Sequence, residues 1–508
     1  MASSFACDVL ICGGGPTGVT LGLSLAQQGI AVIIVEKEAG IYPLPRAAHL
    51  DHEIIRILQG LGVAEEVVAT CRHSSRYDFL NASGKVLLRF DIGDALGAGG
   101  WPTANHIHQP AIEEILHKKL AKTPNIELRH KYELTDLVET DDVVQATCNS
   151  TDGPLTITAR YVVGADGTRS PMRERLGIEL EDMNFDESWL VIDAIVHDFE
   201  RLPKINLQIC DPKRPTTCVL MGEGRHRWEF MMLPGETAED LLADDFAAKQ
   251  LEPWDVEGAV TLERKAVYRF NARIAKTWRK GRILLAGDAA HQTPPFAGQG
   301  MAAGLRDADN LSWKLAAIIQ GTADDAILDS YQSEREPHVR ATIDMAILMG
   351  QTVCVTRKWA AFLRDVKLWI ARVLGLLPDG NIEFPPMNAG LIHQGSAGAG
   401  SYFPQPVAED KKLDDILGKG WWLIHQDEEA IHSGVAGLNT ISLSAPVLSA
   451  HAPALTEWLE AHTAKAVLVR PDHYVFGTGE LDELVQSYHT IFRTEASVVH
   501  EEGCTHVS

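Results

Sequence analysis

Residues 8–18 read Asp-Val-Leu-Ile-Cys-Gly-Gly-Gly-Pro-Thr-Gly, and this stretch decides the fold of the N-terminal part of the chain. Its apolar start predicts a strand, residues 16–28 predict a helix, and residues 31–35 (Ala-Val-Ile-Ile-Val) predict a second strand. Residues 9–35 carry no charge and are long enough for a membrane helix, but glycines and a proline divide them into short elements. We therefore predict a buried βαβ unit and not a membrane span.

The glycine spacing after the first strand is typical of a turn that holds a diphosphate. Gly13 permits a tight turn, Gly15 lets a diphosphate approach the backbone, and Gly18 allows the helix to pack closely on the strand. The N-terminus of the helix then faces the negative charge. Glu36 ends the second strand, where a carboxylate can accept hydrogen bonds from a ribose and disfavours a 2′-phosphate. We predict a site for FAD or NAD that includes Gly13, Gly15, Pro16, Thr17, Gly18, Glu36 and Lys37.

Two later segments also end an apolar run with a small residue and an aspartate. They are residues 161–166 (Tyr-Val-Val-Gly-Ala-Asp) and residues 282–288 (Arg-Ile-Leu-Leu-Ala-Gly-Asp). Residues 294–301 (Pro-Pro-Phe-Ala-Gly-Gln-Gly-Met) predict a turn that leads into a helix. A carboxylate such as Asp288 can bind ribityl hydroxyls, and N–H groups at a helix start can stabilise negative charge near N1–C2=O of a reduced flavin. Together with the first turn, these segments favour FAD over NAD as the tightly bound ligand.

These motifs, in this order, make the chain resemble the group A flavoprotein aromatic hydroxylases, and the resemblance spans nearly its whole length. Within that family, the subgroup of 3-(3-hydroxyphenyl)propionate hydroxylases is favoured by residues 100–102, 109–110, 185–191, 227–231 and 470–475. The resemblance implies FAD as cofactor and adds to its binding residues Arg46, Gln109, Asp166, Asp288, Pro295, Gly298, Gly300 and Met301. His49 departs from the family, whose members tend to have a small residue there. It either alters the pocket or the movement of the flavin, or it is a plain surface residue.

The resemblance also implies the fold class: an α/β protein with a Rossmann-like FAD-binding domain, an inserted antiparallel β-sheet substrate domain and a C-terminal thioredoxin-like domain. The alternating pattern of residues 189–233 agrees with such a sheet. The expected boundaries are 1–180 and 265–375 for the FAD-binding domain, 181–264 for the substrate domain, 376–409 for a linker and 410–508 for the thioredoxin-like domain. The only cysteine of this last domain is Cys504. Without a C-x-x-C pair, disulfide exchange by it is excluded.

The implied activity is hydroxylation of a phenolic ring with NADH or NADPH and dioxygen, through a flavin C4a-hydroperoxide formed near Pro295. Such chemistry needs no side-chain nucleophile and no metal, and the sequence shows no persuasive Ser/His/Asp set or metal-ligand cluster. Only one glycine motif of this kind follows a strand, so the reductant is expected to bind transiently. Two alternatives stay open: a larger polycyclic or resorcinol-type phenol as substrate, and a flavin dehydrogenase or oxidase that does not insert oxygen.

Residues 227–230 are the candidates for contact with the substrate. Alternation places Trp228 and Phe230 on one face of a strand and Arg227 on the other, and either face can line the pocket. A substrate carboxylate would need a basic partner, for which Arg227 is the candidate.

The composition of the 508 residues limits the partners and the cellular location that we expect. A net charge of −23 argues against nucleic acid or an anionic membrane as the main partner. The eight cysteines are irregularly spaced and the start of the chain lacks a basic signal region, so we expect a cytoplasmic enzyme and leave room for a homo-oligomer. Residues 338–376 predict helices with a basic amphipathic stretch, which we interpret as a solvated face packed on the body and not as a membrane-surface helix.

Overall fold

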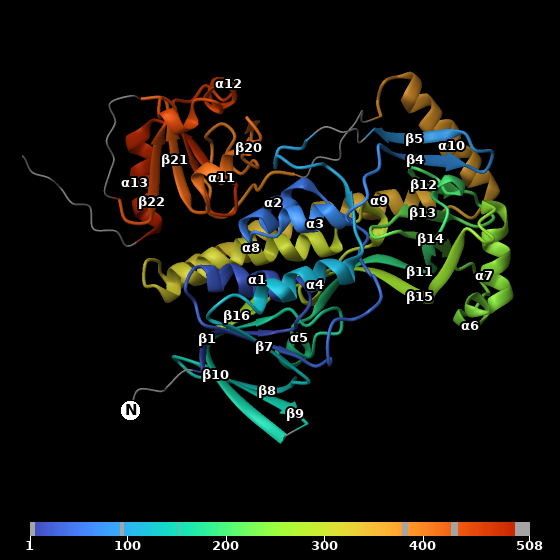
Figure 1. The fold of residues 1–508 in the computed structure, drawn as a ribbon, viewed down its shortest axis with the longest axis horizontal. Helices are drawn as coiled ribbons and strands as arrows, with labels where there is room; N and C mark the ends of the chain where they lie inside the picture. The colour runs from blue at the N-terminus through green and yellow to red at the C-terminus, as the bar shows by residue number, and fades with distance from the viewer. Residues whose placement is uncertain (1–5, 92–95, 152, 378–384, 428–434, 493–508) are drawn as a thin grey trace, which may run out of the picture.

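The computed structural model of the protein describes residues 6–91, 96–151, 153–377, 385–427 and 435–492. In this part of the chain, three sheets of four or more strands form the framework, each with its own helices (Figure 1). The cavity described below lies between the first sheet and the second.

The first sheet is the predicted nucleotide-binding sheet, with the order β16-β17-β10-β1-β2-β7. From β17 to β7 the strands run parallel, and their nearly continuous apolar sequences are buried as expected for parallel strands. An antiparallel ribbon of β8 and β9 extends from β10. The strands are β1 (Cys7–Cys12), β2 (Val32–Glu36), β7 (Ile126–His130), β8 (Glu133–Glu139), β9 (Val144–Ser150), β10 (Gly153–Gly164), β16 (Arg279–Lys280) and β17 (Ile283–Leu285).

Three helices lie side by side on one face of this sheet, with α1 (Pro16–Gln27) between α4 (Gln109–Leu120) and α8 (Gly300–Ile319) (Figure 1). The helix predicted to follow the turn of residues 294–301 begins inside that stretch, at Gly300, because the turn already ends at Gly298, which has a φ of 64°. Smaller elements complete this part: β3 (His49–Leu50), β6 (Asn105–His106), α2 (His52–Gly60), α3 (Ala64–Thr70) and α5 (Pro171–Arg175).

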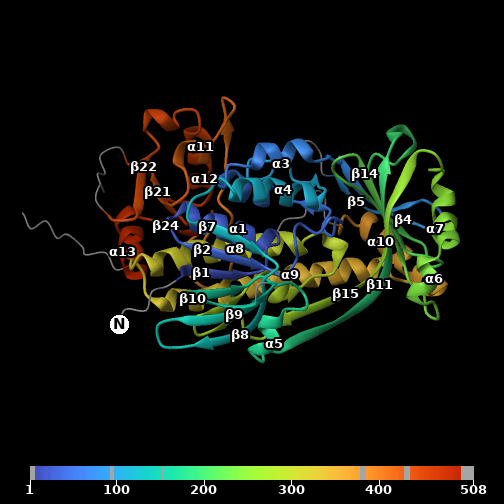
Figure 2. The ribbon, with the colours of Figure 1, turned by 60° about the horizontal axis from the view of Figure 1, so that its bottom comes forward.

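The second sheet has the order β18-β15-β11-β14-β13-β12-β4-β5 and is antiparallel except for the pair β12–β4. Its long strands β11 and β15 reach from this sheet down to the first part of the molecule (Figure 2). Residues 76–91, which precede the expected substrate domain, form two of its strands. The strands are β4 (Arg76–Asn81), β5 (Val86–Asp91), β11 (Leu180–Val196), β12 (Asn206–Cys210), β13 (Thr216–Leu220), β14 (Arg225–Met231), β15 (Val260–Ala275) and β18 (His291–Gln292).

One face of the second sheet is covered by α6 (Ala238–Leu242) and α7 (Asp244–Leu251), with an apolar core between them. The opposite face is turned toward the cavity. Because side chains alternate along a strand, each strand of this sheet gives one set of side chains to the core and the other to the cavity.

Residues 338–376 are largely helical, as predicted, but they belong to two helices, α9 (Asp329–Val353) and α10 (Lys358–Val373). The prediction that α10 turns a basic, solvated face outward is wrong in one respect. Its exposed side chains include Trp359, Phe362 and Trp369, whereas Arg364 and Arg372 bind backbone carbonyls of the body.

The third sheet, β22-β21-β23-β24, is mixed and forms the thioredoxin-like unit with its helices. Its elements, and the small pair before it, are β19 (Val407–Ala408), β20 (Lys411–Lys412), α11 (Leu413–Leu417), β21 (Trp421–His425), β22 (Leu438–Ser442), α12 (Ala452–Ala461), β23 (Ala466–Val469), β24 (Val475–Gly479) and α13 (Leu481–Ile491). Buried ion pairs fasten it to the first part: Arg470 binds Glu334 of α9 at 2.7 Å, and Asp414 binds Arg56 of α2 at 2.6 Å.

Candidate active site

A cavity of about 1650 Å³ runs from the glycine turn after β1 to the inner face of the second sheet. This is larger than the roughly 300–1000 Å³ of most small-molecule sites. The space is therefore sufficient for an extended ligand and a second, smaller molecule. It brings together almost all cofactor residues predicted from the sequence: Gly13, Gly15, Pro16, Thr17, Glu36, Lys37, Arg46, Gln109, Asp166, Asp288, Pro295, Gly298, Gly300 and Met301. Gly18 does not line it.

The three glycines of the first turn meet different surroundings. Gly13 has a φ of 116°, and a Cβ there would lie 2.1 Å from the carbonyl oxygen of Ala165. A Cβ on Gly18 would lie 2.0 Å from the carbonyl oxygen of Gly13, so this glycine serves the close packing of helix on strand. Around Gly15 a Cβ would meet no atom within 4 Å. Gly13 and Gly18 are therefore required by the local packing, and Gly15 leaves open space in front of the turn.

Glu36 is oriented by two backbone amides at the end of β2. Its Oε2 accepts a hydrogen bond from the N–H of Gly14 at 2.7 Å, and its Oε1 accepts one from Glu38 at 2.9 Å. A carboxylate held in this way keeps further acceptor capacity toward the cavity, because each oxygen has two lone pairs.

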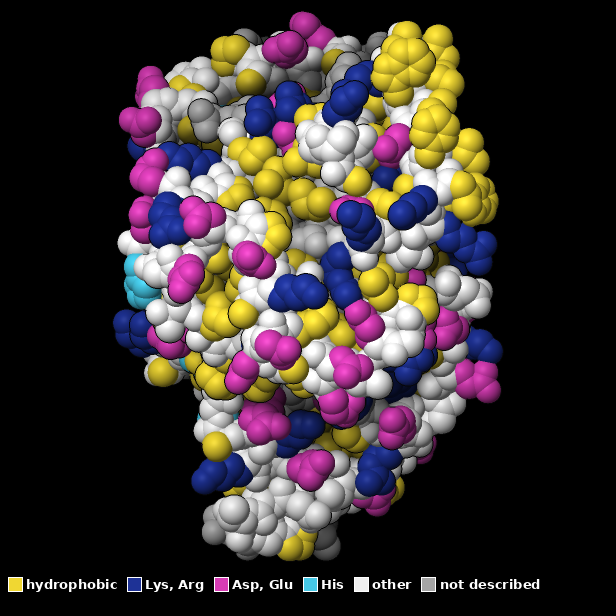
Figure 3. Space-filling view, turned by 90° about the vertical axis from the view of Figure 1, so that its right-hand side faces the viewer, with side chains coloured by type: hydrophobic (Ala, Val, Ile, Leu, Met, Phe, Trp, Pro, Cys, Tyr) yellow, Lys and Arg dark blue, Asp and Glu magenta, His cyan; other side chains and the backbone are white. Residues whose placement is uncertain are grey.

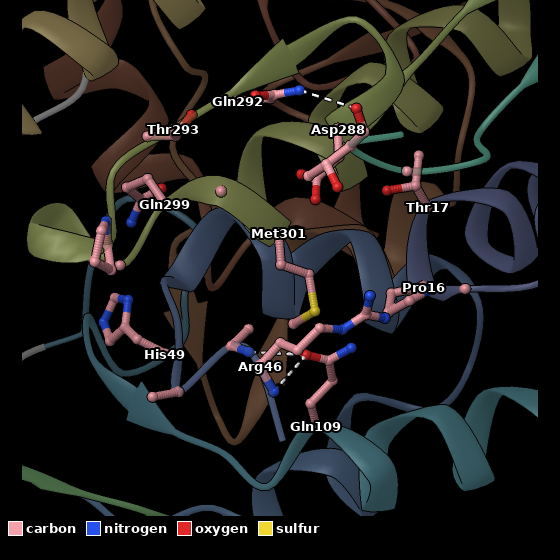
Figure 4. A pocket seen from close by; sticks show the side chains of 18 of the residues that line it. Pro16, Thr17, Arg46, His49, Gln109, Asp288, Gln292, Thr293, Gln299 and Met301 are labelled. Carbon is pink, nitrogen blue, oxygen red and sulfur yellow. Dashed lines mark hydrogen bonds between the residues drawn. The ribbon is translucent and has the colours of Figure 1, made fainter. Parts of the chain in front are cut away.

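Arg46 and Gln109 face the cavity across from the glycine turn. Figure 4 shows the Arg46 side chain extending toward Pro16, with Gln109 below it. The Gln109 Oε1 accepts hydrogen bonds from the N–H groups of Arg46 and Ala47, at 3.2 and 2.8 Å, and its Nε2 donates to Glu113 at 2.7 Å. Gln109 thus holds the loop that carries Arg46.

Two aspartates at the ends of β10 and β17 have carboxyl oxygens without a partner in the described part of the chain. The Oδ1 of Asp166 is buried and unpaired, although its Oδ2 accepts a hydrogen bond from the N–H of Met172 at 3.0 Å. Asp288 lines the cavity beside Thr17 (Figure 4), and no described residue donates a hydrogen bond to its carboxylate. Burial raises the pKa of both carboxyl groups. Unpaired buried acceptors of this kind point to a ligand that donates hydrogen bonds.

The far end of the cavity is formed by residues 295–301. Gly298 adopts the left-handed conformation, and α8 begins two residues later without a side-chain cap, so its first N–H groups stay free for a ligand. His49 lies against this turn: a Cβ on Gly298 would be 3.2 Å from the Cβ of His49. Its ring centroid is 5.6 Å from that of His106, and burial lowers the pKa of both imidazoles. His49 is therefore a cavity residue and not a plain surface histidine.

Beyond this turn, the inner face of the second sheet closes the cavity. The structure therefore shows which of the two faces of β14 lines the cavity. Arg227 and Glu229 line the cavity. Trp228 and Phe230 point the other way, into the core beneath α6 and α7, so their prediction as substrate contacts is wrong. The alternation was correct, but only the pairing of the sheet shows which face meets the cavity.

Arg227 is held by partners of its own. Its Nε donates to Asp193 Oδ1 at 2.7 Å and its Nη2 to Asp193 Oδ2 at 3.2 Å. Its Nη1 and Nη2 also donate to the carbonyl oxygens of Arg46 and Pro45, at 2.9 and 2.8 Å. Arg227 therefore connects the second sheet to the loop that carries Arg46.

Other polar side chains of this face are paired with each other. The Nδ2 of Asn206 donates to His106 Nε2 at 2.9 Å, while its Oδ1 accepts from the N–H of Leu220. This arrangement requires an unprotonated Nε2, in agreement with the lowered pKa of His106. The Oε1 of Gln208 accepts from the hydroxyls of Tyr77 and Thr217, both at 3.0 Å. These groups make the part of the inner face around Asn206 and Gln208 polar but uncharged.

Comparison with known proteins shows the family to which the chain belongs. Residues 6–346 match the FAD binding domain family. A probable NADH-specific resorcinol 4-hydroxylase of Rhodococcus jostii (strain RHA1) is 38% identical, over 93% of this chain and 92% of the relative. A 3-(3-hydroxy-phenyl)propionate/3-hydroxycinnamic acid hydroxylase of Burkholderia cenocepacia (strain HI2424) is 33% identical, over 92% and 93%. The chain belongs to the FAD-dependent aromatic hydroxylases.

Solved structures agree with this hydroxylase in fold. Aklavinone-11 hydroxylase, in complex with FAD and aklavinone, superposes with a TM-score of 0.78 at 23% identity, covering 97% of this chain and all of the other. The rebeccamycin biosynthetic enzyme RebC gives a TM-score of 0.76 at 22% identity, covering 96% and 99%. The family match and the curated relatives confirm the predicted family and FAD cofactor, and the solved structures confirm the fold class.

The cavity of the hydroxylase fits FAD. The open space before Gly15 and the uncapped starts of α1 and α8 suit phosphate and flavin oxygens, which accept hydrogen bonds. The unpaired oxygens of Asp166 and Asp288 suit hydroxyl donors. In the described residues, no group of His, Cys, Asp and Glu side chains is arranged to hold a metal ion, and no helix is long and apolar enough to cross a membrane.

Sequence reasoning missed a layer of buried charge behind α8. Arg306 binds Asp51 at 2.9 Å and Glu53 at 2.7 Å. Next to it, Asp307 accepts hydrogen bonds from Arg335 at 2.9 Å and from the N–H of Gly287 at 3.0 Å. The signal was present, because charged residues on an otherwise apolar, buried helix need partners of opposite charge.

Proposed function

We propose that this hydroxylase acts on a small, uncharged phenol of the resorcinol type. The observation that carries this proposal is the engagement of Arg227, which the sequence offered as the partner of a substrate carboxylate. Its guanidinium donates to Asp193 and to two backbone carbonyls. With Glu229 and Arg264 nearby, the cluster contains two guanidinium and two carboxyl groups, and Asp193 pairs with both arginines.

The remaining groups of the inner face support the same substrate class. Amides, hydroxyls and the neutral imidazole of His106 can exchange hydrogen bonds with phenolic hydroxyls without meeting a charge. A substrate carboxylate would lie beside the buried carboxyl groups of Asp193 and Glu229, and like charges at short distance in a buried site are unfavourable. The resorcinol hydroxylase of Rhodococcus jostii agrees with this reading and makes NADH the reductant to test first.

We propose the following roles around the cofactor. Glu36 binds the adenosine ribose, and the amides of the glycine turn, with Arg46, bind the diphosphate. Asp288 binds ribityl hydroxyls, and the first amides of α8 contact the flavin oxygen. Lys37, Asp166 and residues 295–301 complete the enclosure, and His49 shapes the turn at Gly298. FAD, when bound, supplies the transfer of electrons from NAD(P)H to dioxygen. The chain's own contribution is to place the phenol and to exclude water from this cavity.

The test measures NADH and NADPH oxidation by the FAD-loaded enzyme with resorcinol and with 3-(3-hydroxyphenyl)propionate, and the mass of each product. We expect a gain of one oxygen and a kcat/KM at least about tenfold higher for resorcinol, which corresponds to about 1.4 kcal/mol. A preference for the propionate would contradict the uncharged-substrate proposal and would favour the activity named for the Burkholderia relative. Formation of hydrogen peroxide alone, with every phenol tested, would favour an oxidase.

A further inference from the structure

The outer face of α10 is apolar, and no described residue covers it. Trp359 is 64% exposed, Phe362 67% and Trp369 65%, all on one helix of sixteen residues. Figure 3 shows hydrophobic side chains, several of them aromatic, gathered at one edge of this side of the molecule. The exposed members of the α10 face are Trp359, Phe362, Leu363, Val366, Trp369, Ile370 and Val373.

The size of the α10 face exceeds what a monomer ordinarily leaves in water. An aromatic side chain has roughly 150–250 Å² to bury, so three that are about two-thirds exposed leave on the order of 300–500 Å². Four aliphatic side chains add to this. The largest apolar patch of a typical monomer is roughly 300–600 Å² in all, and one side of a stable protein interface covers about 800 Å². The α10 face therefore approaches the area that a specific interface needs.

The order of residues on this face is symmetric about Val366. Relative to Val366, the other six lie at three, four and seven positions on either side. An antiparallel copy of the helix, related by a two-fold axis at Val366, therefore presents an apolar residue opposite each apolar residue. Trp359 then faces Val373 of the copy, Phe362 faces Ile370, and Leu363 faces Trp369. Each aromatic side chain meets an aliphatic one, and the least exposed residue lies at the crossing point.

The body of the protein holds α10 firmly in this orientation. Arg364 donates to the carbonyl oxygens of Thr352 and Cys210, at 3.1 and 2.9 Å. Arg372 donates to the carbonyl oxygens of Val86 and Leu87, at 3.0 and 3.1 Å. The apolar face is thus presented by a fixed helix, and little ordering is needed when a partner binds.

We propose that the α10 face is the interface of a two-fold dimer, and that its occupant is a second copy of this chain. Isologous interfaces are the most common kind in soluble oligomers, and they require a self-complementary surface of this type. The spacings of three, four and seven residues are those of any apolar helix face, so the choice of a second copy rests on the area of the α10 face and on its rigid support by the body. Two basic side chains of the helix, Arg364 and Arg372, are engaged with backbone carbonyls of the body and are not available to anionic lipid.

The test is sedimentation of the FAD-loaded, full-length protein at concentrations from about 1 to 100 µM, which bracket a micromolar dissociation constant. The wild-type protein is expected to be a dimer, and Val366→Asp a monomer, because its two carboxylates would meet on the axis. Val447→Asp is the matched control: Val447 is 57% exposed, but it lies in the third unit, at the opposite end of the molecule, and this variant stays dimeric. FAD content and thermal unfolding of Val366→Asp should equal those of the wild type.

The dependence of association on salt distinguishes a second copy of the chain from an anionic membrane as the partner. Two copies of like charge associate more strongly as salt screens their repulsion, whereas binding of basic side chains to anionic lipid weakens. A wild-type protein that stays monomeric at all concentrations overturns the proposal, and so does a dimer that survives Val366→Asp. Co-sedimentation of a monomeric wild-type protein with vesicles of anionic phospholipid, abolished by Val366→Asp, would assign the face to a membrane instead.

Cross-linking tests the position of the axis. A cysteine on the two-fold axis lies opposite itself, and two helices packed at 8–10 Å bring such Cα atoms within reach of a disulfide, which needs about 4.4–6.8 Å. In a chain that carries Cys504→Ser, Val366→Cys is expected to form a covalent dimer on oxidation, and Val447→Cys is not. Equal cross-linking of the two variants would overturn the proposed axis.

Discussion

Gly13 and Gly15, two residues apart, make opposite demands on the first turn. At Gly13 the backbone itself occupies the space that a side chain would need, whereas at Gly15 the space is open. The φ of Gly15 is −78°, which any residue can adopt. Gly13 is therefore required by the fold, and we propose that Gly15 is required by the ligand.

Exchange of each glycine for alanine separates these demands. Gly15→Ala should leave the thermal unfolding of the FAD-free protein unchanged, and it should weaken FAD binding at least tenfold, or about 1.4 kcal/mol, because the methyl group fills the space before the diphosphate. Gly13→Ala should destabilise the FAD-free protein itself, since it combines a positive φ with a clash. Calorimetry measures the thermal unfolding of the FAD-free protein, and flavin fluorescence titration measures the affinity for FAD. Unchanged FAD affinity in Gly15→Ala would show that the diphosphate does not lie in front of Gly15.

Arg227 shows what a strand pattern leaves undetermined. Alternation places it on one face of β14 but reveals neither that this face meets the cavity nor that Asp193 lies opposite on β11. The partner comes from the pairing of two strands, and pairing depends on contacts between residues distant in sequence. A residue that looks like a substrate partner in the sequence is, in the structure, a connection between the sheet and the cofactor loop.

Arg227→Met is therefore expected to act on the cofactor more than on substrate choice. It removes two donors from the loop of Pro45 and Arg46, so we expect FAD binding to weaken about tenfold. The ratio of kcat/KM for resorcinol and 3-(3-hydroxyphenyl)propionate should stay the same. Arg225→Met is the control that retains flavin, because Arg225 lies on the same strand but binds Glu263 and does not line the cavity. A large change in the ratio would restore Arg227 as a substrate contact.

At the level of elements, the parts built from local sequence were the most predictable. The first βαβ unit follows from apolar runs and glycine spacing within thirty residues or so. By contrast, β4 and β5 join the second sheet through the parallel pair β12–β4, whose partners Tyr77 and Asn206 are far apart in the chain. Their alternating residues indicate strands but not the sheet to which they belong. The charged layer behind α8 was missed for the same reason, because its partners come from three separate segments.

Helix α8 depends on that layer for its position at the flavin end of the cavity. Arg306→Met leaves Asp51 and Glu53 buried without a cation, which costs roughly 3–5 kcal/mol for a broken buried pair. Thermal unfolding should therefore begin at a clearly lower temperature, and FAD should be lost more readily. Arg340→Met is the matched control, because its pairs with Glu181 and Glu336 are more exposed and contribute about 0–1 kcal/mol. Equal effects of the two variants would contradict a special role for the layer.

At the scale of the whole molecule, buried histidines contribute to the loss of stability in acid. Burial lowers the pKa of His226 and of His473 to about 3. The unfolded chain binds these protons near pH 6.5, so the folded state is fully stable above that pH and loses stability as the pH falls toward 3. At pH 5 each such group costs up to about 2 kcal/mol.

His473→Asn tests this dependence in the third unit. His473 has a φ of 65°, a conformation that asparagine also tolerates, so the turn between β23 and β24 is preserved. The fall in unfolding temperature between pH 7 and pH 5 should be smaller in the variant than in the wild type, as measured by calorimetry at each pH. Parallel curves for the two proteins would show that His473 takes up its proton equally in the folded and the unfolded chain.

The order along the chain of the segments that line the cavity also determines when, during synthesis, the protein can bind FAD and absorb visible light. A nascent chain leaving the ribosome presents the glycine turn of residues 13–18 early, but Asp288 and Met301 emerge only after the whole second sheet has been synthesised. Arg470, whose ion pair with Glu334 joins the last unit to α9, emerges later still. The FAD-binding cavity is therefore incomplete during most of translation. Truncated chains that end before Met301 are expected to be colourless, and visible absorbance reports finished molecules.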